Sequence, residues 1–301
     1  MLNLERLRVL HAVATTGSLA GASRTLHVTT SAVSQQMARL EREVGQALVE
    51  RQGRGVRLTE AGALLAGRAG DLLRHVERVE ADLAEHRGAV DGEVAVAAFA
   101  TAARGLLPAA LRDLRARHPA LAVSLAEQEP HEAIPALSRG LVDVAVVQDW
   151  AEDPLAIPGG LARRHLLDDA FDVALRRDHP LAGRAAVAVK ELAADDWIGW
   201  ATGQICHDWL VRTLAAEGVA PRTAHTASEH STQLALVAAG LGAALIPRLG
   251  REPAPAAVRF VPLDPPPVRR VFALWRESAA ARPAIGAALR ALERSAAAPL
   301  P

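Results

Sequence analysis

Short hydroxyl and amide side chains gather between residues 29 and 35, where they could bond to the edges of nucleic-acid bases. An amide can pair with adenine, and a hydroxyl or methyl group can contact other base edges. The spacing predicts a helix from about Thr30 to Val44, buried along one apolar stripe. Its opposite face carries the base-contacting candidates, which are Thr30, Ser31, Ser34 and Gln35. Because polar residues on an outer helix face are usually only solvated, the surrounding elements must decide between the two interpretations.

Two earlier helices and a tight turn are predicted to position this face. Apolar residues repeat at spacings of three and four from Leu4 onward, which predicts a first helix that ends at Gly17. Ser18 can cap a second helix, and Thr29 can cap the third after a turn at residues 27–28. This order is that of a helix-turn-helix, whose last helix lies in the DNA major groove. The elements therefore favour DNA recognition.

A basic hairpin is predicted directly after the third helix. Strand-forming residues flank a turn at Gln52–Gly55, and Arg51, Arg54 and Arg57 would project from the hairpin toward phosphates or the minor groove. Arg39 adds a positive charge on the third helix. The chain holds 34 basic and 34 acidic residues, yet residues 1–58 hold eight arginines against four glutamates. A local basic excess on a neutral chain indicates a polyanionic partner for this segment, namely double-stranded DNA.

The residues of this segment resemble, in register, the winged helix-turn-helix of LysR-type transcriptional regulators. The matching residues are Leu4, Leu7, Gly17–Leu19, Leu26–Thr29, Ser31–Gln36, Leu40–Glu41, Leu48, Arg51 and Arg57–Gly62. The resemblance implies that Ser18, Thr29, Thr30, Ser31, Ser34, Gln35, Arg39, Arg51, Arg54 and Arg57 form the DNA-binding surface. Ser31 stands where the family often has proline, and Gln35 where it often has arginine. We therefore expect operator preference to differ at the bases that these two residues meet.

A long helix is predicted over residues 60–88. Its apolar positions alternate at spacings of four and three, as in a coiled-coil seam. They are Leu65, Ala69, Leu72, Val76, Val79 and Leu83. The stripe could pack on the chain's own C-terminal domain, but we favour dimerisation because two helix-turn-helix modules must be paired to contact two half-sites. The resemblance implies a dimer along this helix, with dimers pairing into tetramers.

Beyond a hinge at residues 88–92, predicted strands and helices alternate, which indicates an α/β sheet with mostly parallel strands. The final strand and helix are expected to return to the first subdomain, as in periplasmic-binding-protein-like folds. We divide the chain into a winged helix-turn-helix (1–59), a linker helix (60–88) and an effector-binding domain (89–301). Within the last, lobe 1 covers about 89–162 and 267–301, and lobe 2 covers about 163–266.

A ligand cleft is predicted between these lobes, with crossings near 148–164 and 264–267. Ligands of parallel α/β sheets sit at the carboxyl ends of strands, where helix N-termini offer N–H groups. The candidate effector-binding residues at these loops are Thr101, Ala102, Gln148, Trp150, Trp200, Thr202, Gly203, Ser228 and His230. A small carboxylate or other polar metabolite would suit such a site, with Trp150 or Trp200 as an apolar wall. The resemblance puts the inducer pocket at the same loops.

Other classes of protein are weaker fits. For an enzyme, the glycines of 240–244 follow a helix and precede a strand, the reverse of a phosphate-binding loop, and Cys206–Asp208 are neighbours that cannot face one another. A transporter's solute-binding protein would need an export signal, and none is evident. A repressor with a purely structural C-terminal domain stays open.

We therefore expect a cytoplasmic regulator that is not an enzyme. The lone cysteine fits a reducing compartment, and no apolar run is long enough to span a membrane. The histidines lack metal-ligand spacing, so we expect no metal and no cofactor. RNA polymerase is a further expected partner.

Overall fold

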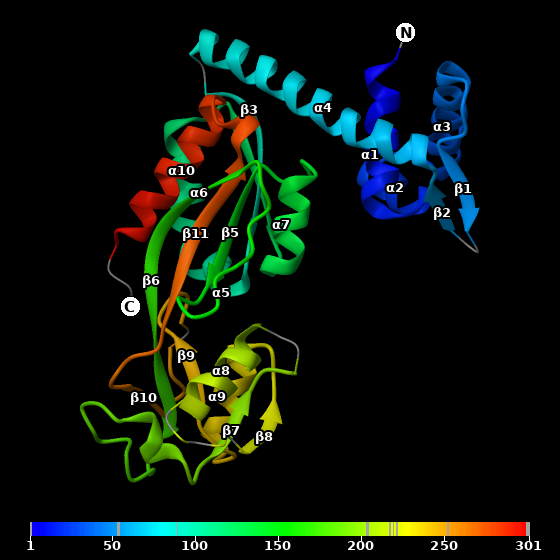
Figure 1. Cartoon of the computed structure of the whole chain (residues 1–301). Coiled ribbons are helices and arrows are strands. Elements are labelled where there is room, and N and C mark those ends of the chain that lie inside the picture. The colour runs from blue at the N-terminus through cyan, green and yellow to red at the C-terminus, as the bar shows by residue number, and fades with distance from the viewer. Residues whose placement is uncertain are drawn as a thin grey trace.

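The computed structural model describes residues 2–52, 55–88, 90–202, 205–216, 218, 220, 222–251 and 253–298. Figure 1 shows a small helical module at the N-terminus, a long helix that leads away from it, and a C-terminal domain of two lobes. Within the described residues, no helix has the combination of length and apolar composition that crossing a membrane would require.

The N-terminal module has the predicted winged helix-turn-helix order. Its elements are α1 (Leu4–Thr16), α2 (Leu19–Thr25), α3 (Thr30–Val44), β1 (Val49–Gln52) and β2 (Gly55–Leu58). The caps are those expected from the sequence, since Ser18 Oγ accepts from the Gly21 N–H and Thr29 Oγ1 from the Ala32 N–H. Leu10 and Leu40, both fully buried, lie at the centre of its core.

Two local contacts fix the hairpin against the helices. Glu41 Oε1 accepts hydrogen bonds from the N–H groups of Leu48 (2.8 Å) and Val49 (3.2 Å), which ties α3 to β1. A side chain at Gly62 is impossible without rearrangement, because its Cβ would lie 1.9 Å from the Leu48 carbonyl oxygen. The start of the long helix α4 (Glu60–Arg87) is therefore held directly on the module.

The predicted dimer seam is wrong for the first half of α4. Ala69 is fully buried and Leu65 packs into the same core as α1, so these two residues are occupied within their own module. Farther along the helix, Leu72, Val79 and Leu83 are 46%, 47% and 61% exposed. Leu64, which the sequence-based seam omits, is exposed on the same helix. The stripe that is free for a partner therefore lies mainly in the second half of α4.

Lobe 1 follows α4. Its elements are β3 (Gly92–Ala98), α5 (Ala100–Gly105), α6 (Leu107–Arg117), β4 (Leu121–Glu127), α7 (Pro130–Ser138), β5 (Val144–Asp149), β11 (Val268–Arg276), η2 (Glu277–Ala279) and α10 (Pro283–Ala296). In Figure 1, α6 and α10 cover one face of the lobe 1 sheet and α7 lies on the other. Helices α5 and α6 follow one another with Leu106 between them, and Pro108 lies in the first turn of the second.

Lobe 2 is formed by the residues that lie in sequence between the two long connecting strands, β6 (Leu161–Arg176) and β11. Its elements are η1 (Val189–Leu192), β7 (Asp196–Gly199), α8 (Ile205–Ala216), β8 (Arg222–Thr226), α9 (His230–Ala238), β9 (Ala244–Pro247) and β10 (Val258–Pro262). Phe171, Trp197 and Leu245 are fully buried in the lobe, within separate apolar clusters from those of lobe 1.

The expectation of mostly parallel strands is wrong for this sheet. Parallel pairing joins β3 to β4 and β5, and β7 to β8. By contrast, β11 is antiparallel to both β5 and β6, and β6 is antiparallel to β9 and β10. The reason is the return of the chain, because β6 (Leu161–Arg176) runs from lobe 1 into lobe 2 and β11 runs back beside it.

The crossing between the lobes also lies later than predicted. Residues 161–170 of β6 pair with β11, and 171–176 pair with β9 or β10. Leu167 belongs to the core of lobe 1, whereas Phe171 belongs to that of lobe 2. The first crossing therefore falls in the middle of one continuous strand near Ala170, and not in the loop over 148–164.

Candidate DNA interface and effector cleft

The predicted base-contacting face is present on α3. Thr30, Ser31, Ser34 and Gln35 are all exposed, while Val33 and Met37 are buried on the opposite side of the helix. At its N-terminus, Ser31 Oγ and Thr29 Oγ1 lie 2.9 Å apart, and the Thr30 hydroxyl donates to Ser23 Oγ at 3.2 Å. The first turn of α3 is thus ordered by hydroxyl contacts, and Gln35 follows it as an exposed residue of the same helix. This face has the polar groups that major-groove contact requires.

The basic residues around α3 are described in part. Arg39 is exposed on α3, and Arg57 on β2 is exposed and paired with Glu50 of β1. Ser18 serves as the α2 cap. Arg54 and the side chain of Arg51 lie outside the described residues. Arg57 is therefore the wing arginine whose place the structure gives.

A cleft of about 1240 Å³ opens between the two lobes. Lobe 1 contributes Thr101 and Gln148, which are buried, and lobe 2 contributes Trp200, Ser228 and His230. These five are the predicted effector residues that the fold brings together. This volume is large enough to hold a small-molecule ligand.

Three other predicted effector residues are not brought to the cleft, and a fourth lies outside the described residues. Ala102 is fully buried in the core of lobe 1, and Thr202 is exposed but does not line the cleft. Trp150 is fully buried and stacks on Trp209 with ring centroids 3.9 Å apart, so it holds the crossover segment to lobe 2 and forms no cleft wall. Gly203 lies outside the described residues.

The floor of the cleft is built on Arg269 of β11, which sequence reasoning missed. Its guanidinium, 2% exposed, donates to Asp169 Oδ2 (2.8 Å), Thr101 Oγ1 (2.6 Å) and Gln148 Oε1. The rings of Phe99 and Phe171 also lie near it, with centroids 4.9 and 5.2 Å from the guanidinium carbon. Paired arginines inside an apolar strand pattern, VRRVFALW, were the signal that could have revealed it.

Two polar side chains on opposite walls of the cleft lack hydrogen-bond partners among the described residues. Glu129 lies just before α7 in lobe 1, and burial raises the pKa of its carboxyl despite the positive charge of Arg269 nearby. His230 begins α9 in lobe 2, and burial, aided by Arg269 and Arg104, lowers its pKa to about 3. The Nε2 atom of His230 is buried and has no hydrogen-bond partner among the described residues. Glu129 follows the carboxyl end of β4, where ligands of parallel α/β sheets are expected to bind, so the sequence could have indicated it.

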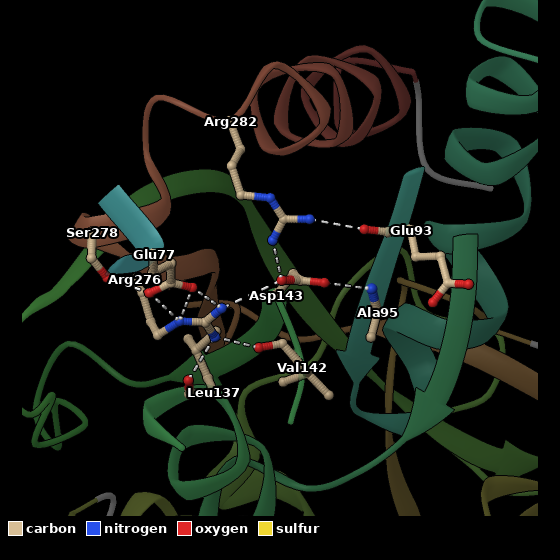
Figure 2. Close-up of polar contacts among 9 residues, drawn as sticks. All are labelled: Glu77, Glu93, Ala95, Leu137, Val142, Asp143, Arg276, Ser278 and Arg282. Carbon is tan, nitrogen blue, oxygen red and sulfur yellow. Dashed lines mark hydrogen bonds and ion pairs between the residues drawn. The ribbon is translucent and has the colours of Figure 1, made fainter. Parts of the chain in front are cut away.

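A buried joint connects α4 to lobe 1 (Figure 2). Arg276, at the end of β11, hydrogen-bonds both carboxylate oxygens of Glu77 on α4, with a shortest distance of 2.6 Å. Its Nη1 donates to the carbonyl oxygens of Leu137 and Val142. The Ser278 hydroxyl donates to the second oxygen of Glu77 at 2.6 Å. The linker helix is thus bonded to the same strand that carries Arg269 seven residues earlier.

The charge of Glu77 is stabilised by this joint. Burial alone would raise the pKa of its carboxyl, but the hydrogen bonds from Arg276 and Ser278 outweigh burial and lower it. Asp143 continues the network, because it lies 3.4 Å from Arg276, 2.6 Å from Arg282, and accepts from the Ala95 N–H at 2.9 Å. The network therefore joins α4, β3, β11 and the start of α10.

Comparison with known proteins matches both parts of the chain. Residues 4–63 match the "Bacterial regulatory helix-turn-helix protein, lysR family" model, and residues 87–297 match the "LysR substrate binding domain" model. The transcriptional regulator TtuA of Agrobacterium vitis is 30% identical over 87% of this chain and 86% of its own. OxyR of Escherichia coli is 28% identical over 91% and 88%.

Solved structures show the same fold. A full-length OxyR variant of Pseudomonas aeruginosa superposes with a TM-score of 0.73 at 23% identity, covering 98% of this chain and 95% of that one. Full-length CbnR in complex with its target DNA superposes with a TM-score of 0.55 at 24% identity, covering 98% and 100%. The chain belongs to the LysR family of transcriptional regulators, with a DNA-binding helix-turn-helix and a two-lobed effector-binding domain. Its relatives are regulators and not enzymes.

Proposed function

We propose that Thr30, Ser31, Ser34 and Gln35 determine which operator this regulator binds, and that Arg39, Arg57 and the other wing arginines hold the DNA backbone. The observation that carries this proposal is the exposed polar face of α3, bordered by two capped helices and a wing. Base contacts give sequence preference, whereas phosphate contacts give affinity that falls with salt.

Two copies are proposed to pair along the exposed part of α4, through Leu72, Val79 and Leu83. A dimer would present two α3 helices to half-sites about one DNA turn apart. Tetramers would require a second pairing surface, so the helix seam accounts for the first step of assembly. RNA polymerase is the proposed downstream partner.

The cleft between the lobes is proposed to bind the effector, for which a small carboxylate is the expectation from sequence. A ligand that prefers one arrangement of the lobes would shift the population of that arrangement. Because Arg276 bonds lobe 1 to α4, such a shift would reach the helix that carries the DNA-binding module. The single cysteine of this sequence has no second cysteine with which to form an intramolecular disulfide, and ligand binding is the proposed signal.

Selection of bound fragments from genomic DNA, followed by affinity measurements, tests the DNA contacts. Arg57→Ala should weaken binding to all sequences and reduce the salt slope by about one, whereas Gln35→Ala should relax preference at particular bases by about 1–3 kcal/mol. Arg117→Ala on α6, far along the chain, is the matched control and should change neither. A uniform loss for Gln35→Ala would show that it does not contact bases.

Sedimentation of the full chain tests the pairing surface. Leu72→Asp should convert dimers to monomers, because it puts a charge into the proposed seam. Leu241→Asp, at a leucine that is 41% exposed in lobe 2, is the control. A Leu72→Asp protein that stays dimeric would remove α4 from the interface.

A further inference from the structure

The charge of the effector can be inferred from the groups in the cleft that are still able to bond it. The cations of the cleft are already engaged. Arg269 has hydrogen bonds to Asp169, Gln148 and Thr101, and Arg104 Nε donates to the Gly250 carbonyl oxygen at 2.7 Å. An incoming carboxylate would therefore have to displace bonds that hold the floor of the cleft.

The helix ends at the cleft are also countered by the protein itself. Glu129 is the N-cap residue of α7, and Glu229 is the N-cap residue of α9. A carboxylate beside a helix N-terminus offsets the positive end of the helix dipole. With Glu127 and Asp208, these glutamates make the lining richer in carboxylates than in cations. The two helix ends consequently offer little attraction to an anion.

Glu129 is an acidic residue of the cleft whose carboxylate receives no hydrogen bond from the described residues. It is half-buried, and within the described part of the chain no N–H or hydroxyl group donates to its carboxylate. Burying a charge is costly unless it is paired and hydrogen-bonded. A ligand ammonium or guanidinium would supply both the charge and the N–H donors, in a charge-assisted bond of about 2.7–2.9 Å.

His230 provides the second contact from the opposite lobe. Its ring packs edge-on against Trp200, with centroids 5.8 Å apart, and its Nε2 is buried without a partner in the part of the chain that the structure describes. The low pKa keeps this imidazole neutral, so it can exchange a hydrogen bond with a polar group but cannot supply a cation for a carboxylate.

We infer that the effector is a small organic amine, whose ammonium or guanidinium group pairs with Glu129 and whose far end meets His230 across the cleft. The inference rests on the proposed role of the cleft as the effector site. It replaces the carboxylate expectation with a ligand of opposite charge, and it makes Glu129 the residue that selects that charge.

Matched amines and carboxylates test the inference on the full-length protein. The probes are benzylamine against benzoate and putrescine or agmatine against succinate, measured by tryptophan fluorescence and thermal stabilisation. At least one amine should bind while its carboxylate counterpart does not. Glu129→Gln should weaken that amine by about tenfold or more, which is what loss of one charge-assisted hydrogen bond predicts. Glu132→Gln, an exposed acid on the same helix, is the control and should leave binding unchanged.

Two results would overturn the inference. Binding of carboxylates alone would show that the ligand class is wrong, while the cleft and the proposed function would stand. Failure of both series at millimolar concentration would also count against it, because an unpaired carboxylate should give these amines measurable weak affinity. Failure of the proposed function would be seen separately, as loss of specific DNA binding by the unmodified chain.

Discussion

The joint at Arg276 and the cleft at Glu129 are two polar regions that both involve lobe 1, and they differ in whether their hydrogen bonds are complete. At the joint, Arg276 is bonded to Glu77, Leu137 and Val142. At the cleft, Glu129 and His230 Nε2 have no hydrogen-bond partner among the described residues. A buried polar group without a partner costs about 1–3 kcal/mol. Folding alone thus completes the hydrogen bonds of the joint, whereas a ligand would complete those of the cleft.

The contrast assigns different tasks to the two regions. A joint whose bonds are complete moves as one body with the elements it connects, so α4 and lobe 1 should move together. A cleft with unpaired groups on opposite lobes gains bonds when the lobes close on a ligand. The closing motion would then be carried by β6 and β11, which connect the lobes, and passed on to α4 at the end of β11.

The largest expected effect comes from removing the central cation of the joint. Arg276→Met should lower the free energy of unfolding by about 3–5 kcal/mol, because it leaves Glu77 and two carbonyl groups without their partner. Arg294→Met is the control, since Arg294 pairs with Asp113 at the surface, where solvent screens the pair, and should have a much smaller effect. Urea unfolding of both variants measures the difference. Equal effects would mean that the joint is no stronger than a surface ion pair.

A strong pH dependence should come from His230 at the cleft. Its pKa is lowered from 6.5 to about 3, so the folded state keeps it neutral while the unfolded chain takes up a proton. Its contribution to stability is therefore present above about pH 6.5 and is lost as pH falls toward 3.

Thermal unfolding across this range should show a shallower loss of stability for His230→Asn than for the wild type. His86→Asn, at an exposed histidine of α4, should leave the wild-type slope unchanged. Identical slopes for His230→Asn and the wild type would show that His230 is not buried as a neutral group.

A smaller effect is expected from the floor of the cleft. Thr101→Val removes one acceptor of Arg269 but leaves Asp169 and Gln148 in place, so it should cost about 0.5–1.5 kcal/mol. Thr226→Val, at an exposed threonine of β8, should be near neutral. Chemical denaturation compares the two. A Thr101→Val protein as stable as the wild type would show that the Arg269 cluster is less tightly built than its hydrogen bonds imply.

Local patterns predicted the parts of the fold that depend on neighbours in sequence. The capped helices α2 and α3 and the hairpin of β1 and β2 were predicted from hydroxyl caps, apolar spacing and a glycine turn. A final strand and helix were also expected to return to lobe 1, and they are β11 and α10. These elements depend on interactions between residues only a few positions apart, which can be recognised directly in the sequence.

Features that depend on distant pairing were not predicted correctly. The antiparallel course of β6 and β11 follows from where the chain returns, and no local pattern records that. The position of Trp150 after β5 predicts a cleft residue, yet Trp150 stacks on Trp209, far along the chain. The joint likewise pairs Arg276 with Glu77, 199 positions earlier in the chain, and no periodic pattern in the sequence indicates a contact over that separation.

The most direct test of the central claim is a pair of identical chemical changes, Glu77→Gln and Glu129→Gln, compared by urea unfolding at neutral pH without ligand. The pKa of Glu77 is lowered by its partners, so its charge stabilises the fold above its ordinary value of 4.5, and that contribution is lost as pH falls. The pKa of Glu129 is raised by burial, so its charge opposes folding as pH rises above 4.5.

The two variants should therefore shift stability in opposite directions. Glu77→Gln should lower the free energy of unfolding, and Glu129→Gln should raise it by about 1 kcal/mol, because the neutral amide removes a charge that burial destabilises. Shifts of the same sign would contradict the distinction between a completed joint and a cleft that awaits its ligand.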